Sequence, residues 1–357
     1  MLTYWFLFAL LAWMALTHLR PLTTTSMQRT KWGLAWIGIF ALLVTLIGFR
    51  HEVGGDWFTY LNHVETLQNE PLSEFWLHGD PAYSLLNWVA ANVFGGIYLT
   101  NTVSAILFGW GLVYFCKSQP RPWLVLVVAM PYLITVVAMG YTRQGVAIGL
   151  AMLAMVALFE GSIWRFIGWI ALAGLFHKSA IVLIPMAVFG DTRRLWITTL
   201  GVAVTGILLF LLLLQEAMEG LVSNYIEAEY QSAGAGIRIA MNAVPAALFL
   251  WFRKRFALPD KVRRFWTWMA ISALGFVVLL LISPSSTAVD RVALYWIPLQ
   301  LFVWGRLPDA LGLPGRKNPI WVCLVVLYSA LVLFVWLFFA EHSSAWLPYR
   351  FYPFEML

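Results

Sequence analysis

A histidine and a lysine stand side by side in LAGLFHKSAIVLIP (Leu172 to Pro185), between two apolar runs. The imidazole of His177 can accept a proton near neutral pH, so it is a candidate general base. Arg165 lies only twelve residues earlier. That is about 18 Å of helix, whereas the bilayer core is about 30 Å thick. If Arg165 lies at one membrane surface, His177 stops below the other. The alternative is a histidine that bonds between helices for structure.

Six cations are spread one per segment, at helix ends or in loops, on the side where basic residues are otherwise sparse. They are Arg50, Arg143, Lys178, Arg238, Arg291 and Arg350. A single arginine at a helix end is often only in contact with lipid headgroups. Six together can converge on a polyanion, and a pyrophosphate suits them because guanidinium groups match phosphate oxygens in a fork.

The third polar cluster is RHEVGGDWFTY (Arg50 to Tyr60). Its paired glycines allow a sharp turn. Asp56 follows the turn, and Trp57 and Tyr60 are placed to flank a ligand. The alternative is an interfacial turn capped by the aspartate, with the aromatic residues as membrane anchors.

The composition indicates what positions these residues. Of 357 residues, 61% are hydrophobic and 11% are charged, which predicts an all-α polytopic integral membrane protein. About twelve transmembrane helices are expected, two of them short, plus a surface or partly inserted helix over 80–96. The expected spans are 2–19, 32–49, 97–115, 122–139, 144–159, 163–176, 179–190, 195–214, 237–252, 265–282, 292–305 and 319–339. The two cysteines have no metal-site spacing and are interpreted as core residues.

The basic residues orient this layout. Setting the six aside leaves seventeen of the 23 Lys and Arg on one side, which is therefore predicted to be cytoplasmic. A single membrane domain over 1–357 is expected. Its outer segments are 50–96, with the surface helix, 215–236, and the tail 340–357. The inner loops hold no glycine-rich nucleotide loop, so any chemistry should face outward. No internal repeat is visible, which disfavours a transporter built from two halves.

Six short motifs occur in order along the chain. They are FRHEVGGDWFTY, GDPAYSLLNWV, YTRQGVAIGLAMLA, LFHKSAIVLIP, DRVALYW and the terminal WLPY. With them the chain resembles the EpsG-like branch of Wzy-type polysaccharide polymerases, although Trp57 stands where tyrosine is commoner. The resemblance implies a GT-C-like glycosyltransferase of the bacterial inner membrane that needs no metal or cofactor. It would join oligosaccharide repeat units, carried on undecaprenyl pyrophosphate as donor and acceptor, at the periplasmic face.

On that resemblance His177 is the first choice of base and Asp56 the second. Arg143, Arg238 and Arg291 are expected at the pyrophosphate, with Arg50 and Lys178 as second choices; Trp57, Tyr60, Tyr83 and Tyr141 are candidates for sugar contacts. Membrane lipids and a chain-length regulator are the expected partners, and nucleic acid is not. Two alternatives stay open. One is a transferase that adds one sugar or a ligase that moves a finished glycan, and the other is a transporter of the lipid-linked glycan.

Overall fold

The computed structural model describes residues 1–22, 32–190, 234–283 and 285–355. Within these ranges the regular elements are helices, and Arg50 and Phe351 form an isolated β-bridge. The α-helices are α1 (Leu2–Thr17), α2 (Leu34–Gly48), α3 (Trp57–Thr66), α4 (Pro81–Asn92), α5 (Gly96–Lys117), α6 (Pro122–Ala129), α7 (Thr142–Phe159), α8 (Ile163–Phe176), α9 (Ala187–Gly190), α12 (Ala235–Phe252), α13 (Asp260–Ile282), α14 (Ser286–Ala293), α15 (Ile297–Leu311), α16 (Pro319–Phe339) and α17 (Tyr352–Glu355). The tighter or wider helices are η1 (Leu72–His78), η2 (Met130–Ala138), η3 (Lys178–Met186), η5 (Leu294–Trp296) and η6 (Ser343–Trp346).

Five of the described helices are long and apolar enough to cross a membrane: α5, α7, α12, α13 and α16. Shorter apolar helices are α1, α2, α8 and the continuous run of α6 and η2. The prediction of a helical membrane protein is therefore confirmed. The count of twelve spans and the GT-C-like arrangement stay predictions. The expected helix 195–214 and most of the segment 215–236 lie outside the described residues.

Two of the predicted spans have different forms in the structure. The run 179–190 is not one α-helix but the 3₁₀ helix η3 followed by the four-residue α9. His177 ends the preceding helix because its backbone is extended (φ −158°, ψ 109°). Pro185 lacks the N–H that a regular helix would need. The run 292–305 is divided among α14, η5 and α15, so the helix tightens to a 3₁₀ turn at Leu294–Trp296 before α15 begins.

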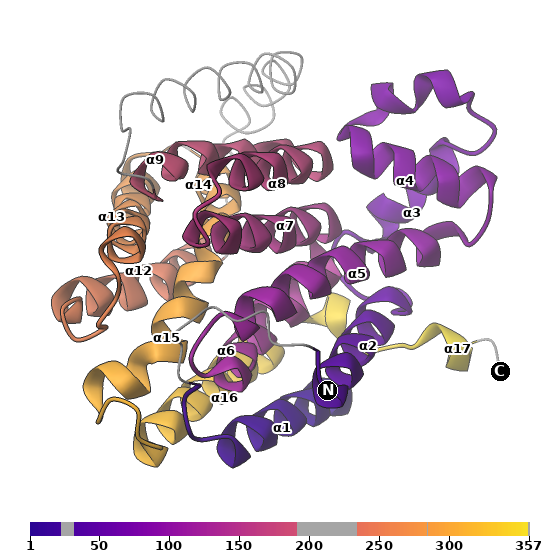
Figure 1. The fold of residues 1–357 in the computed structure, drawn as a ribbon. Coiled ribbons are helices and arrows are strands. Elements are labelled where there is room, and N and C mark those ends of the chain that lie inside the picture. The colour runs from indigo at the N-terminus through magenta and orange to yellow at the C-terminus, as the bar shows by residue number, and fades with distance from the viewer. Residues whose placement is uncertain (23–31, 191–233, 284, 356–357) are drawn as a thin grey trace.

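Helix α7 lies at the centre of the bundle, between α5 and α8 (Figure 1). Its contact with α5 depends on two glycines that let the backbones approach closely. A Cβ added at Gly111 would lie 2.0 Å from the carbonyl oxygen of Gly149, and one at Gly149 would lie 2.7 Å from Cα of Phe108. Tight packing along α7 fixes its first turn, which carries Arg143.

The C-terminal segment covers the same end of the bundle. Pro131 and Thr135 lie in the π-helix η2, and its wide turns leave backbone groups for other partners. The indole Nε1 of Trp346 donates to the carbonyl of Thr135 at 2.8 Å, and the hydroxyl of Tyr4 donates to the carbonyl of Trp346 at 2.9 Å. A side chain at Gly140 would collide with this indole. The tail is therefore packed against α1 and η2.

The opposite end of the bundle gathers the basic segments predicted to share one side. Arg121 makes a bidentate pair with Asp309, with both N···O distances 2.8 Å. The same guanidinium donates to the carbonyls of Leu19, Arg316 and Lys317. The ends of α1 and α15 and the starts of α6 and α16 thus meet around one arginine, as the charge distribution predicted.

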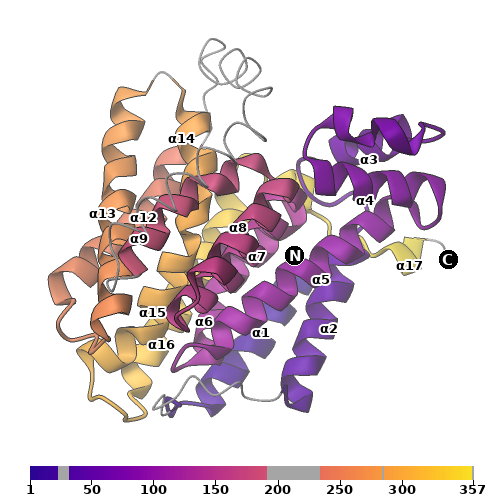
Figure 2. The ribbon, with the colours of Figure 1, turned by 45° about the horizontal axis from the view of Figure 1, so that its top comes forward.

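Helices α3 and α4 form a small layer at the N-terminal end of α5, away from these basic loops (Figure 2). A helix is observed within the expected range 80–96 as α4, and α3 is an additional helix within the segment 50–96. The position of α4 at a membrane surface stays a prediction. This layer places Asp80 and Tyr60 against the first turn of α7.

Candidate active site

Asp80 is the centre of a polar cluster built from three separate segments. Its carboxylate accepts a bond from Nη1 of Arg143 at 3.1 Å and one from the backbone N–H of Lys178 at 3.1 Å. Nδ1 of His177 lies 3.5 Å from the same carboxylate. The Asp80 side chain is 6% exposed, whereas those of His177 and Arg143 are 26% and 29% exposed. The carboxylate is thus buried beneath two groups that still reach the surface.

The ends of helices position all three side chains. Asp80 stands at the N-cap of α4 before Pro81 and makes no capping bond, so its carboxylate is turned toward the cluster. Arg143 lies in the first turn of α7, and His177 is the extended C-cap of α8. The N-termini of α4 and α7 both point at this region, and their dipoles favour bound anions.

The guanidinium of Arg143 faces two aromatic rings. Its Cζ lies 5.9 Å from the ring centres of Tyr60 and of Tyr83, which contact each other edge to face at 5.7 Å. Nε of Arg143 is buried and has no hydrogen-bond partner within the described residues. A partly exposed guanidinium with a buried donor to spare fits the predicted role of binding an anion.

Arg50, a second choice for the pyrophosphate, is placed differently. It is fully buried, and Nε donates to the carbonyl of Val53 at 3.1 Å. Nη1 donates to the carbonyl of Ile47. Nη2 donates to Asn101 at 3.0 Å and to Thr142 at 2.8 Å. Because four of its donors are used inside the protein, Arg50 ties α2, α5 and α7 together and does not reach a ligand.

Two more of the predicted cations lie beside α14. Arg238 makes a bidentate pair with Asp290, with both N···O distances 2.8 Å. Arg291 stacks on the ring of Tyr141, with its Cζ 4.4 Å from the ring centre. Arg238, Arg291, Asp290 and Asp56 all lie within electrostatic range of the Tyr141 hydroxyl. The structure thus brings Arg143, Arg238 and Arg291 to one end of the bundle.

The pKa values of the two aspartates in segment 50–96 are shifted in opposite directions. Burial raises the pKa of Asp56, and the charges of Arg291 and Arg143 offset only part of this effect. Burial also acts to raise the pKa of Asp80, but His177, Arg143 and the Lys178 N–H outweigh it and hold the pKa below the ordinary value. Asp80 is therefore a fixed anion that orients its neighbours, whereas Asp56 is the carboxylate better suited to accept a proton.

The predicted sugar contacts receive only partial support. Trp57, Tyr60 and Tyr83 are at most 3% exposed. Trp57 covers the guanidinium of Arg50, with its ring centre 5.7 Å from Cζ. These three rings pack around arginines, so they position the guanidinium groups and are not open platforms for a sugar. Tyr141 is partly exposed and stays a candidate.

The sequence interpretation omitted Asp80 and Asp290. Both carboxylates pair with predicted cations, but neither was among the predicted site residues. The available signals were the acid itself in GDPAYS and the acid beside Arg291 in VDRV. Lys178 contributes its backbone N–H to Asp80, a role that side-chain chemistry does not predict.

The described residues form a helical membrane protein with a buried acid, a histidine and several arginines gathered at one end of the bundle. The chain is a member of the EpsG family, whose model matches residues 34–351. No curated protein and no solved structure matches the chain. Membership confirms the resemblance drawn from the six motifs and associates the chain with polysaccharide biosynthesis.

Proposed function

We propose that this protein polymerises oligosaccharide repeat units carried on undecaprenyl pyrophosphate, at the periplasmic face of the bacterial inner membrane. The observation that carries the proposal is the Asp80 cluster. It holds a histidine and an arginine with a spare buried donor side by side, at the bundle end opposite most of the basic residues. Family membership supports the substrate class.

The proposed step is a displacement at the anomeric carbon of the donor glycan. The acceptor hydroxyl oxygen forms the new bond to this carbon, and the bond to the pyrophosphate oxygen breaks and leaves its electron pair there. The hydroxyl proton passes to a base. Nδ1 of His177 faces Asp80, so Nε2 is the nitrogen available to the hydroxyl, and Asp56 with its raised pKa is the second candidate. The negative charge on the pyrophosphate meets Arg143, Arg238 and Arg291, which are already in place.

The assay is reconstituted protein in proteoliposomes, supplied with one purified lipid-linked repeat unit. A ladder of glycans is expected from the wild type. His177→Ala in a protein that still folds is expected to lose at least about a hundredfold in rate, the usual contribution of a general base. Normal rates and chain lengths from this variant would eliminate His177 as the base and leave Asp56.

The product also separates the alternatives. A transferase or ligase would add one unit and stop, giving a single new band. A transporter would move the lipid-linked unit across the bilayer and leave its length unchanged. Either result, from protein shown to bind the lipid-linked unit, refutes polymerisation.

A further inference from the structure

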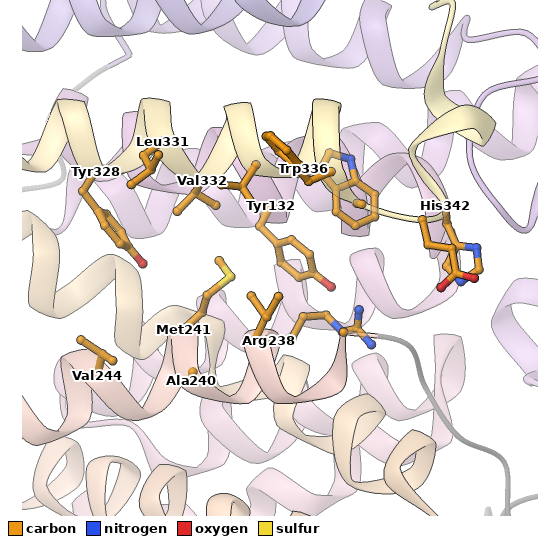
Figure 3. A pocket seen from close by; sticks show the side chains of 16 residues that line it. Tyr132, Arg238, Ala240, Met241, Val244, Tyr328, Leu331, Val332, Trp336 and His342 are labelled. Carbon is orange, nitrogen blue, oxygen red and sulfur yellow. The ribbon is translucent and has the colours of Figure 1, made fainter.

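An apolar groove of about 560 Å³ lies between α12 and α16, with η2 at its back (Figure 3). Its walls are aliphatic and aromatic, and they include Met241, Val244, Leu331, Val335 and Phe339. Several of these side chains face outward, and Leu331 is 58% exposed and Phe339 71% exposed. In a membrane such a groove opens sideways to lipid, and its volume is in the range of small-ligand sites.

One end of the groove is polar. Tyr132, from η2, is only 6% exposed and lines the groove, and its hydroxyl makes no hydrogen bond with any described residue. Figure 3 shows this hydroxyl pointing toward the guanidinium of Arg238, at the end where His342 also lies. A hydroxyl on the groove lining, beside an arginine and without a hydrogen-bond partner among the described residues, fits an anionic group at that point.

We propose that this groove binds the polyprenyl chain of a polyprenyl diphosphate, with the diphosphate at the hydroxyl of Tyr132 and the guanidinium of Arg238. Met241, Val244 and Leu331 would contact the first part of the chain, and the remainder would lie in the bilayer. The inference rests on the proposed function for the choice of lipid. It adds where that lipid enters and which residues select it.

The bound lipid is the donor. In the proposed reaction the donor's sugar is attached directly to its diphosphate, so that diphosphate must lie at the reacting atoms. The acceptor reacts at the far end of a whole repeat unit, away from its own diphosphate. Arg238 and Asp56 both lie within electrostatic range of the hydroxyl of Tyr141, so the polar end of the groove and one of the candidate bases lie at the same end of the bundle.

Two groups at the rim act against or modulate this binding. Glu341 lines the groove and brings a negative charge, and His342 beside it is neutral unless protonated. Asp290 already pairs with one edge of Arg238. Glu341→Gln is therefore expected to tighten diphosphate binding by about twofold, the size of effect of an exposed charge pair.

The test measures binding alone. Full-length protein in nanodiscs is labelled with an undecaprenyl diphosphate that carries a diazirine on its chain, and the crosslinked peptides are identified. Labelling is expected in 237–244 and 328–339. Unlabelled undecaprenyl diphosphate should compete with the diazirine lipid and reduce crosslinking. Undecaprenol and phosphatidylglycerol should be about tenfold weaker competitors because they lack the diphosphate.

Three variants assign the contacts. Leu331→Trp fills the groove and is expected to weaken binding about tenfold, whereas Leu281→Trp, on an exposed position of α13 (81% exposed) outside the groove, should bind as wild type does. Tyr132→Phe should lower the affinity for undecaprenyl diphosphate about tenfold. Competition by undecaprenol should be unchanged, and this result also shows that the variant is folded.

Equal competition by phosphatidylglycerol, labelling spread over α13, or an unchanged affinity in Leu331→Trp would each overturn the proposal. The binding test does not measure glycan transfer, so it is independent of the proposed function. If the groove binds the lipid but the protein makes no polymer, the proposed function is refuted and the groove assignment stands. If the protein makes polymer but the crosslinks lie outside the groove, the groove assignment is refuted and the proposed function stands.

Discussion

Replacing Asp80 with asparagine tests whether its carboxylate acts as a fixed anion that stabilises the folded protein. The amide keeps the size of the side chain but removes the charge that faces Arg143 and His177. Loss of one partner from a buried pair costs about 3–5 kcal/mol because the other charge is left without compensation. Arg143 and His177 are 29% and 26% exposed, so water relieves part of this cost. We expect a loss of about 2 kcal/mol in the free energy of unfolding.

The sign of the pH dependence follows from the lowered pKa of Asp80. A carboxyl group with a depressed folded pKa contributes stability above its unfolded pKa of about 3.9, and this contribution is lost as the pH falls through the folded value. The destabilisation of Asp80→Asn should therefore be complete at pH 5.5 to 7.5 and shrink below about pH 4. Thermal unfolding in detergent, followed by tryptophan fluorescence, should show a transition lower by roughly 3–6 °C at neutral pH.

Asp56→Asn is the matched control because its pKa is raised. Its charged form costs stability above the folded pKa, so the neutral amide should unfold at the same or a higher temperature at pH 7.5. The difference should vanish as the pH falls toward the unfolded pKa. An Asp80→Asn protein as stable as wild type at pH 7.5, or one whose deficit grows on acidification, would refute the assignment of Asp80 as a fixed anion.

Four further predictions concern activity and packing. In Arg143→Lys the charge stays but the fork is lost, so folding is retained and polymer formation in proteoliposomes should fall at least about tenfold; full activity would indicate a headgroup contact. Arg50→Lys should instead destabilise by about 3 kcal/mol, since four bonds to buried partners depend on the guanidinium; a normal melting temperature contradicts its structural role. Gly111→Ala should lower the yield of folded protein on size-exclusion chromatography, because the added Cβ would lie 2.0 Å from a backbone oxygen, while Gly275→Ala, with open space around it, should match or exceed the wild type. If Asp56 is the base, the rate of Asp56→Asn should fall about a hundredfold without loss of stability, and a rate equal to wild type leaves His177.

Helix borders were predicted best where local signals are strong. The helix 163–176 is observed with the predicted borders, and Ser162 accepts a bond from the backbone N–H of Arg165 as its cap. Helix 319–339 also matches and begins at a proline. The run 179–190 was misassigned because apolar composition does not distinguish an α-helix from a 3₁₀ helix that contains a proline.

The candidate site was predicted in its residue types more than in its pairings. His177, Arg143 and Arg291 were selected for their chemistry and do gather at one end. Asp80 was missed because its partners lie 63 and 97 positions away along the chain. No local pattern records such a contact, which forms only when α4 packs beside α7 and α8.

By itself the sequence determined that the chain is a helical membrane protein of the EpsG family, because hydropathy and short motifs are local properties. The tertiary structure alone distinguished Arg50 from Arg143. Both are arginines at the end of an apolar run, yet four donors of the Arg50 guanidinium bond to buried carbonyls and side chains. Nε of Arg143, in contrast, is buried and has no hydrogen-bond partner among the described residues. Whether a guanidinium N–H is bonded inside the protein depends on which acceptors the neighbouring helices place beside it, and helix packing determines those positions.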